Sequence, residues 1–208
     1  NVPYDFLAIS YYPHITHPHE MDMEKVYANQ IAPILEHADY NPEASFEIHE
    51  YKFIVKMKRA GFVSVATSHN SAFFAMLAKM MLTHNIKEVF QWGNVQEGSY
   101  SPEAMTQLAL FSMVGNTLYE NTSSVSKTRQ GNTVNGIFTK READEGIDVL
   151  TFSFNNENME ALEPELLQIH VRVDKPAGTQ FQYRMAQINS ETNIEQQFFN
   201  DFPKAMII

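Results

Sequence analysis

Cysteine is absent from this sequence of 208 residues. Without a thiol the chain can form no disulfide framework, no thiolate metal site and no cysteine nucleophile. The absence does not identify a compartment, because many exported bacterial proteins also lack cysteine.

Basic side chains are also scarce: 15 Lys and Arg stand against 25 Asp and Glu, for a formal net charge of −10. A chain of this charge repels a phosphate backbone, so we expect no nucleic-acid partner. Runs of about 18 consecutive apolar residues are lacking too, so we expect no membrane span.

Apolar and aromatic residues, in contrast, are plentiful at 44% and 12%, enough for a sizeable core. The sequence opens directly on an apolar run, Tyr4–Tyr12, without a leading Met. We therefore expect a part of a longer protein, with some of its chemistry upstream.

Residues 1–120 alternate between strand and helix patterns, which is typical of a parallel α/β domain. Helical spacing of apolar residues, or a Ser-Pro start, predicts the helices. The predicted strands are Tyr4–Tyr12, Ser45–Tyr51 and Ile86–Trp92, and the predicted helices are Glu20–His37, Ser71–Thr83 and Ser101–Tyr119.

Residues 121–208 follow a different pattern, in which a polar linker, Asn121–Asn132, is followed by strands separated by turn signals. Leu150, Phe152 and Phe154 share one face of such a strand, as expected for half-buried antiparallel sheet. We predict a β-sandwich domain. Its expected strands are Thr133–Lys140, Ile147–Asn156, Leu166–Val173 and Thr179–Asn189.

Polar and aromatic residues end each of the predicted parallel strands. Tyr11 and Tyr12 end the first, Glu50 lies at the end of the second, and Trp92 with Asn94 follows the third. The carboxyl ends of parallel strands form the active face of an α/β barrel. A carboxylate among aromatic side chains suits glycoside hydrolysis, which needs an attacking carboxylate and a platform for the sugar.

These strand ends resemble the glycoside hydrolases of clan A, most closely family 39, which contains β-xylosidases and α-L-iduronidase-like enzymes. The motifs that carry the resemblance are Asp5-Phe6 through Ser10-Tyr11-Tyr12-Pro13, Ile48-His49-Glu50-Tyr51, Val89-Phe90-Gln91-Trp92 and the late-strand segment Tyr183–Asn193. The resemblance implies the last strands and helices of a (β/α)8 TIM barrel, followed by an antiparallel β-sandwich.

The same resemblance implies a retaining mechanism without a cofactor. Glu50 is then the nucleophile, Tyr12 its hydrogen-bonding neighbour and Trp92 the floor of the sugar subsite, while Ser10 stands where the family commonly has His. The acid/base Glu belongs to an earlier barrel strand, upstream of this chain. The implied substrates are β-xylosides or related plant and algal polysaccharide fragments, and the implied location is periplasmic or extracellular.

Alternative readings of the sequence stay open at this stage. Glu47 is the alternative nucleophile, although strict alternation along a strand puts it on the face opposite to Glu50. The loop residues His14, His17, His19 and Glu20 have side chains that suit zinc, which keeps a metal-dependent hydrolase as a weak alternative. A non-catalytic carbohydrate-binding or scaffolding module is the other alternative. The expected partners are a carbohydrate and either the missing half of the barrel or another copy of the chain.

Overall fold

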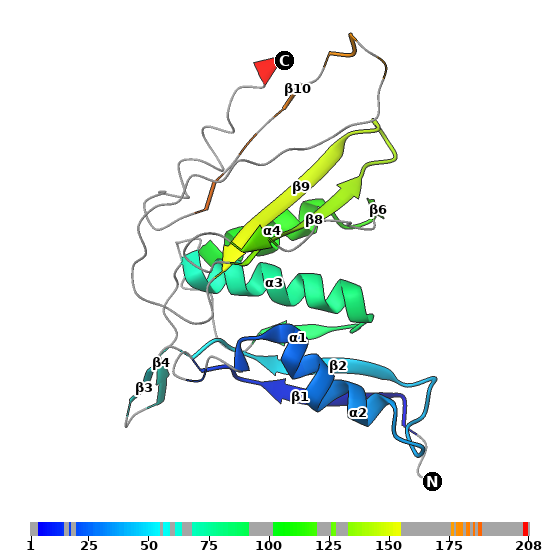
Figure 1. Ribbon diagram of the computed structural model, residues 1–208, viewed down its shortest axis with the longest axis vertical. Coiled ribbons are helices and arrows are strands. Elements are labelled where there is room, and N and C mark those ends of the chain that lie inside the picture. Colours follow the sequence, from blue (N-terminus) through cyan, green and yellow to red (C-terminus); the bar gives the residue numbers. More distant parts are fainter. Residues whose placement is uncertain are drawn as a thin grey trace.

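The computed structural model describes residues 4–14, 17, 20–54, 56–58, 61–63, 68–91, 102–119, 126–127, 133–154, 176, 178–180, 182–183, 185, 187–188 and 206–207. Within these ranges a parallel sheet and an antiparallel sheet lie on either side of helices α3 (Ser68–His84) and α4 (Pro102–Ser112) (Figure 1). The chain passes from the parallel part to the antiparallel part in the order that the sequence predicts.

The parallel sheet contains the strands β1 (Phe6–Tyr11), β2 (Ser45–Tyr51) and β5 (Val89–Gln91), with β2 in the centre. Both pairings are parallel, so all three strands end at the same edge of the sheet. Strand β2 has the bounds that the sequence predicts, and β1 and β5 are shorter versions of the predicted strands.

The segment between β1 and β2 is helical, as predicted, but it is not one regular helix. It consists of α1 (Met23–Val26), the π-helix η2 (Tyr27–Ile31) and α2 (Ala32–Leu35). Asp22 caps its start by accepting a hydrogen bond from the Lys25 backbone N–H at 3.3 Å. Pro33 has no N–H to donate to the Asn29 carbonyl, which explains why the regular hydrogen-bonding pattern is interrupted just before it.

Helix α3 connects the two sheets through its apolar side chains. Phe73 is fully buried, and its ring lies 6.0 Å from the ring of Tyr51 in β2 and 5.5 Å from the ring of Phe154. Phe154 ends β9 (Ile147–Phe154), a strand of the antiparallel sheet. One continuous core therefore joins both parts of the described chain.

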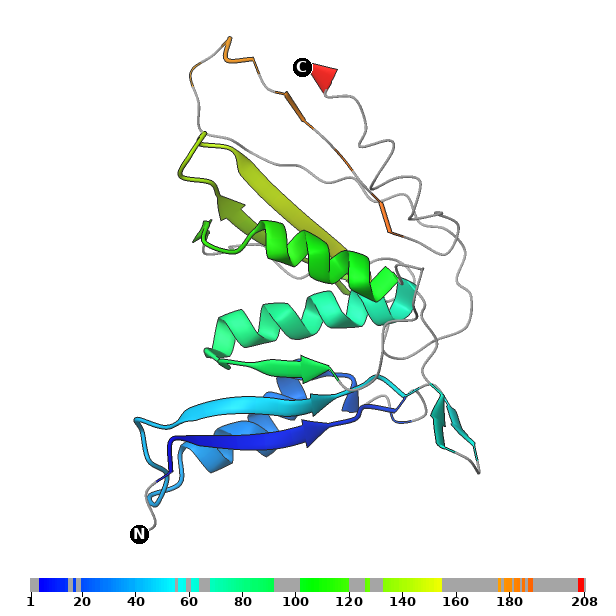
Figure 2. The same ribbon diagram turned by 180° about the vertical axis from the view of Figure 1, so that it is seen from behind.

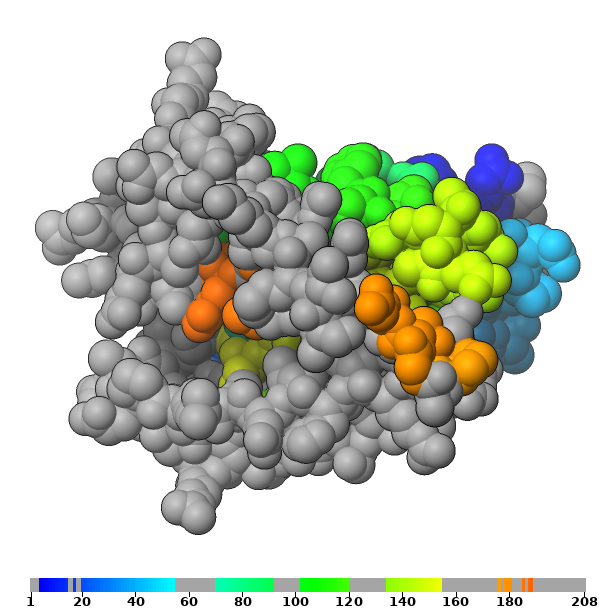
Figure 3. Space-filling view, turned by 90° about the horizontal axis from the view of Figure 1, so that it is seen from above, coloured from blue at the N-terminus to red at the C-terminus, as the bar shows by residue number. Residues whose placement is uncertain are grey.

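The antiparallel part is built on a hairpin of β8 (Thr133–Lys140) and β9, paired along their full length. The short strands β6 (Thr117–Leu118) and β7 (Ser126–Lys127) also pair with β8, so the predicted linker contains a strand. Seen from above, the atoms of the β8–β9 hairpin (yellow-green) reach the surface beside those of the α4 segment (green) (Figure 3).

The short hairpin of β3 (Lys56–Lys58) with β4 (Gly61–Val63) and the antiparallel pair of β10 (Gln182–Tyr183) with β11 (Met206–Ile207) complete the described elements. The predicted strand Leu166–Val173 lies outside the described residues. The barrel, the sandwich and the division at residue 120 stay predictions.

Strand β2 contains a β-bulge, which the sequence analysis did not predict. Ile9 of β1 pairs with Ile48, yet the next residue, Ser10, pairs with Glu50. The pairing with β5 shifts over the same stretch, from Ile48 to Tyr51. One extra residue is therefore inserted in β2 between Ile48 and Tyr51, and such an insertion changes which way the following side chains point.

Candidate active site

The two faces of the parallel sheet have different surroundings. The side chains of Leu7, Ile9, Tyr11, Phe46, Ile48 and Tyr51 belong to or pack on the core formed with the helices. Seen from behind, no described element covers the opposite face of β1 and β2 (Figure 2). Phe6 and Phe90 lie on that face and are 50% and 51% exposed. We call it the open face, and its other side chains include Ser10, Tyr12, Glu47, His49 and Glu50.

Glu50 lies near the carboxyl end of β2, where its side chain is exposed. Its Oε2 atom accepts a hydrogen bond from the Tyr12 hydroxyl at 2.8 Å and another from the Ser10 hydroxyl at 3.3 Å. No described residue donates a hydrogen bond to its Oε1 atom. The carboxylate is therefore held from the β1 side by one oxygen, while the other accepts no hydrogen bond from the part of the chain that the structure describes.

Tyr11 and Tyr12 are separated by the alternation of the strand. Tyr11 is 7% exposed, and its hydroxyl donates to the Glu20 carbonyl and lies 3.1 Å from the Met23 sulfur. Tyr11 thus belongs to the helix-facing core and is not brought to Glu50. Partial burial and the hydrogen bond to Glu50 raise the pKa of Tyr12, so this hydroxyl stays protonated and can donate.

Glu47 lies on the open face together with Glu50, contrary to the expectation from strict alternation. Because β2 contains one inserted residue, the side chain of Glu50 points to the same face as that of Glu47. Glu47 is only 9% exposed and accepts hydrogen bonds from Ser45 and, at 2.6 Å, from His49 Nε2. Both of its oxygens are thus engaged, and these hydrogen bonds lower its pKa. Glu47 is a poor nucleophile and a poor general acid.

Glu103, in the first turn of α4, is a buried carboxyl that the sequence analysis did not single out. Burial raises its pKa, while the charge of Lys52 and a hydrogen bond from Gln91 act in the opposite direction. Its negative charge also acts on the buried Tyr51. Glu103 therefore lies on the helix-facing side of the sheet, away from Glu50. The pairing of Glu103 with residues from β5 and the end of β2 is a tertiary feature that no sequence motif signals.

The His-rich loop gives no sign of a metal centre where it is described. Glu20 binds the His14 backbone N–H at 3.1 Å and the His17 ring at 3.2 Å. No group of three or more metal-ligating side chains occurs within the described ranges. His19 lies outside them, as do Trp92 and Asn94, the predicted sugar contacts.

Of the helices that the structure describes, none combines the length and the apolar character of a membrane span.

One curated protein with clear sequence similarity is a protein of Formosa agariphila named alpha-1,4-L-rhamnosidase, which is 33% identical over 193 residues. The alignment covers 92% of this chain but only 38% of the rhamnosidase, so the chain spans well under half of the relative's length. No protein-family model matches the chain, and neither does a solved structure.

The chain is therefore related to a glycoside hydrolase, and this relationship extends over nearly all of it. The class of chemistry agrees with the class that the strand-end residues favour. Membership of family 39 and of clan A stays a prediction.

Proposed function

We propose that this chain is the carboxy-terminal part of a retaining glycoside hydrolase in which Glu50 is the nucleophile. The observation that carries the proposal is the hydrogen bonding of Glu50. Oε2 is held by Tyr12 and Ser10, while Oε1 accepts nothing from a described residue. A nucleophilic carboxylate needs this arrangement, because it must be oriented and yet keep one oxygen available to attack the anomeric carbon.

The second carboxyl group of such a mechanism must protonate the leaving oxygen. A general acid needs a raised pKa, whereas the hydrogen bonds to Glu47 lower its pKa. Glu103 has a raised pKa but lies with Tyr51 and Gln91 on the other side of the sheet. We infer that the acid/base residue comes from an upstream strand of a (β/α)8 barrel, which also covers the open face. The rhamnosidase relative is long enough to contain such a further segment, because the alignment covers only 38% of it.

The name of the relative indicates which substrates to test first, namely α-L-rhamnosides with a 1,4 linkage. β-Xylosides, which the motif resemblance implies, are the second set. From this substrate class we propose a periplasmic or extracellular location.

The test of the proposal is covalent trapping of the glycosyl-enzyme. The protein, extended upstream to the length of the relative, is incubated with a slow fluorinated rhamnoside or xyloside, and the labelled peptide is mapped by mass spectrometry. We expect the label on Glu50, within the peptide that covers Ser45–Tyr51. A label on Glu47, or on a residue outside this strand, contradicts the assignment.

Tyr12→Phe tests the contact that holds the nucleophile. The substitution removes the 2.8 Å hydrogen bond to Glu50 but leaves the ring and the Ser10 hydroxyl in place. One hydrogen bond to a charged group contributes about 1.5 to 3 kcal/mol, so kcat should fall about 10- to 100-fold. Steady-state kinetics measures this loss, and an unchanged melting temperature shows that the fold is retained. Tyr40→Phe, far from this strand end, is the matched control, and an unchanged kcat in Tyr12→Phe refutes the contact's role.

A further inference from the structure

His49 and Glu50 are consecutive residues whose side chains lie on the same face of β2. The His49 ring contacts Phe6 and Phe90 on the open face, and Glu50 contacts Ser10 and Tyr12 there. Consecutive side chains of a regular strand point to opposite faces. The same-face arrangement therefore depends on the bulge between Ile48 and Tyr51.

The contacts of His49 fix its side chain in this arrangement. Its Nε2 atom lies 2.6 Å from Glu47 Oε2, and its ring centroid lies 4.9 Å from that of Phe6 and 5.5 Å from that of Phe90. These partners come from β1, β2 and β5, so His49 is held from both neighbouring strands. Ser45 occupies the other oxygen of Glu47 and keeps that carboxylate directed at His49.

We propose that His49 is the positioning residue that maintains the bulge in β2 and thereby directs Glu50 toward the substrate. This inference rests on the proposed function of Glu50. The extra residue of a bulge can be absorbed in more than one way, and a shift of one residue turns a side chain to the other face of the sheet. A one-residue shift of β2 that turned Glu50 toward the helices would also move His49 off the open face. His49 would then lose its contacts with Glu47, Phe6 and Phe90, so these contacts oppose the shift.

His49→Phe isolates the hydrogen bond to Glu47, because the new ring retains the aromatic contacts with Phe6 and Phe90. It leaves the Glu47 carboxylate, which is almost buried, without its second donor. We expect kcat of the extended protein to fall about 10²-fold, the effect of a displacement of about 1 Å in a catalytic group, with little change in KM. We expect His49→Gln, whose amide can still donate to Glu47, to restore most of kcat.

The matched control is His84→Phe. His84 also pairs with a glutamate, Glu24 at 3.0 Å, and its ring stacks on Tyr27 at 3.6 Å, but it lies at the end of α3 on the helix side. We expect this variant to melt at a lower temperature and to keep kcat. If His49 only stabilises the fold, His49→Phe should likewise lower the melting temperature and leave kcat unchanged.

A crystal structure of His49→Phe supplies a readout that does not depend on activity. We expect Glu50 to have lost its contact with Tyr12. An unchanged Tyr12–Glu50 contact in this structure, or wild-type kcat in the variant, overturns the role of His49. An extended wild-type protein that hydrolyses no glycoside overturns the proposed function instead, and the crystal structure still decides whether His49 positions Glu50.

Discussion

Replacement of Glu50 by Gln is expected to lower kcat of the extended protein by about 10⁴-fold or more, the loss typical of a removed nucleophile. Gln has nearly the same shape as Glu and can still contact Tyr12 and Ser10, but its amide cannot attack the anomeric carbon. KM for the sugar should change little, because the uncharged group still fills the same volume. Single-turnover and steady-state kinetics with aryl rhamnosides and xylosides measure both values.

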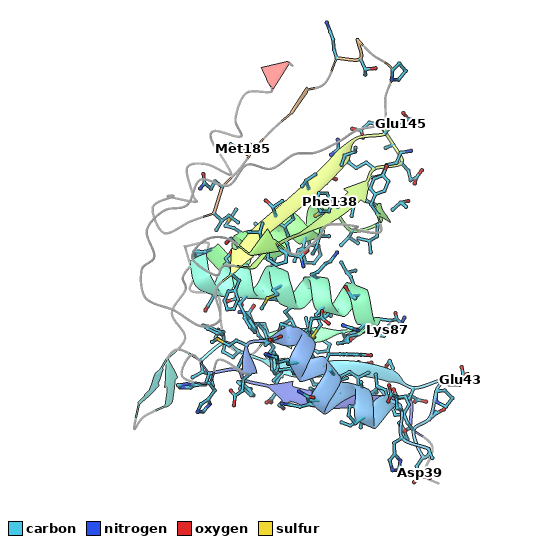
Figure 4. All side chains as sticks on the ribbon, in the orientation of Figure 1. Asp39, Glu43, Lys87, Phe138, Glu145 and Met185 are labelled. Carbon is cyan, nitrogen blue, oxygen red and sulfur yellow. The ribbon has the colours of Figure 1, made fainter. Side chains whose placement is uncertain are left out.

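Glu43→Gln is the control for this experiment, because Glu43 is exposed and precedes β2, at the end of the strand opposite to Glu50 (Figure 4). It should keep full activity. Glu47→Gln is not a neutral control, since Glu47 shares the open face with Glu50 and binds His49. A Glu50→Gln protein with more than about one tenth of the wild-type kcat is incompatible with a nucleophilic role.

The chain by itself is expected to be inactive toward glycosides that the extended protein hydrolyses. Retaining hydrolysis requires two carboxyl groups about 5 to 5.5 Å apart, and Glu47, the carboxylate that shares strand β2 and the open face with Glu50, has a lowered pKa that does not suit a general acid. Three strands also cannot close a barrel, so Phe6 and Phe90 remain half exposed on the uncovered face.

Release of an aryl glycoside chromophore, measured for equal concentrations of the two proteins, tests this expectation. The extended protein carrying Glu50→Gln gives the background rate. Turnover by the short chain clearly above that background shows that a second carboxyl is already present and contradicts the inference of an upstream acid. Size-exclusion chromatography gives a second readout, because an uncovered apolar face should make the short chain self-associate.

The sequence by itself was sufficient for the order of the three parallel strands and of the helical segments between and after them, but not for the β3–β4 hairpin, the π-helix η2 or the strand β6 within the predicted helix Ser101–Tyr119. The apolar runs around Ile9, Ile48 and Val89 form parallel strands in the predicted order, because such runs are stable only when buried on a sheet. Pro102, the first residue of α4, and the alternating face of Phe152 and Phe154 were equally informative, since both signals are local.

The position of Glu50 near the end of a parallel strand could also be predicted from the sequence, because a strand end is defined by local pattern, while its role as nucleophile stays a prediction. The partner of Tyr11 could not be predicted, since its hydroxyl contacts Glu20 and Met23 after the chain has turned back through a loop. The same holds for Glu103, whose neighbours Lys52 and Gln91 come from the residue after β2 and from β5.

The sequence therefore determined where β2 ends, and the tertiary structure decided which side chains of β2 share a face. A period of two residues places Glu47 and Glu50 on opposite faces, and only the pairing of β2 with both neighbours reveals the inserted residue that brings them together. Register between strands depends on contacts across the sheet, such as those of His49 with Phe6 and Phe90, which a pattern along one strand does not contain.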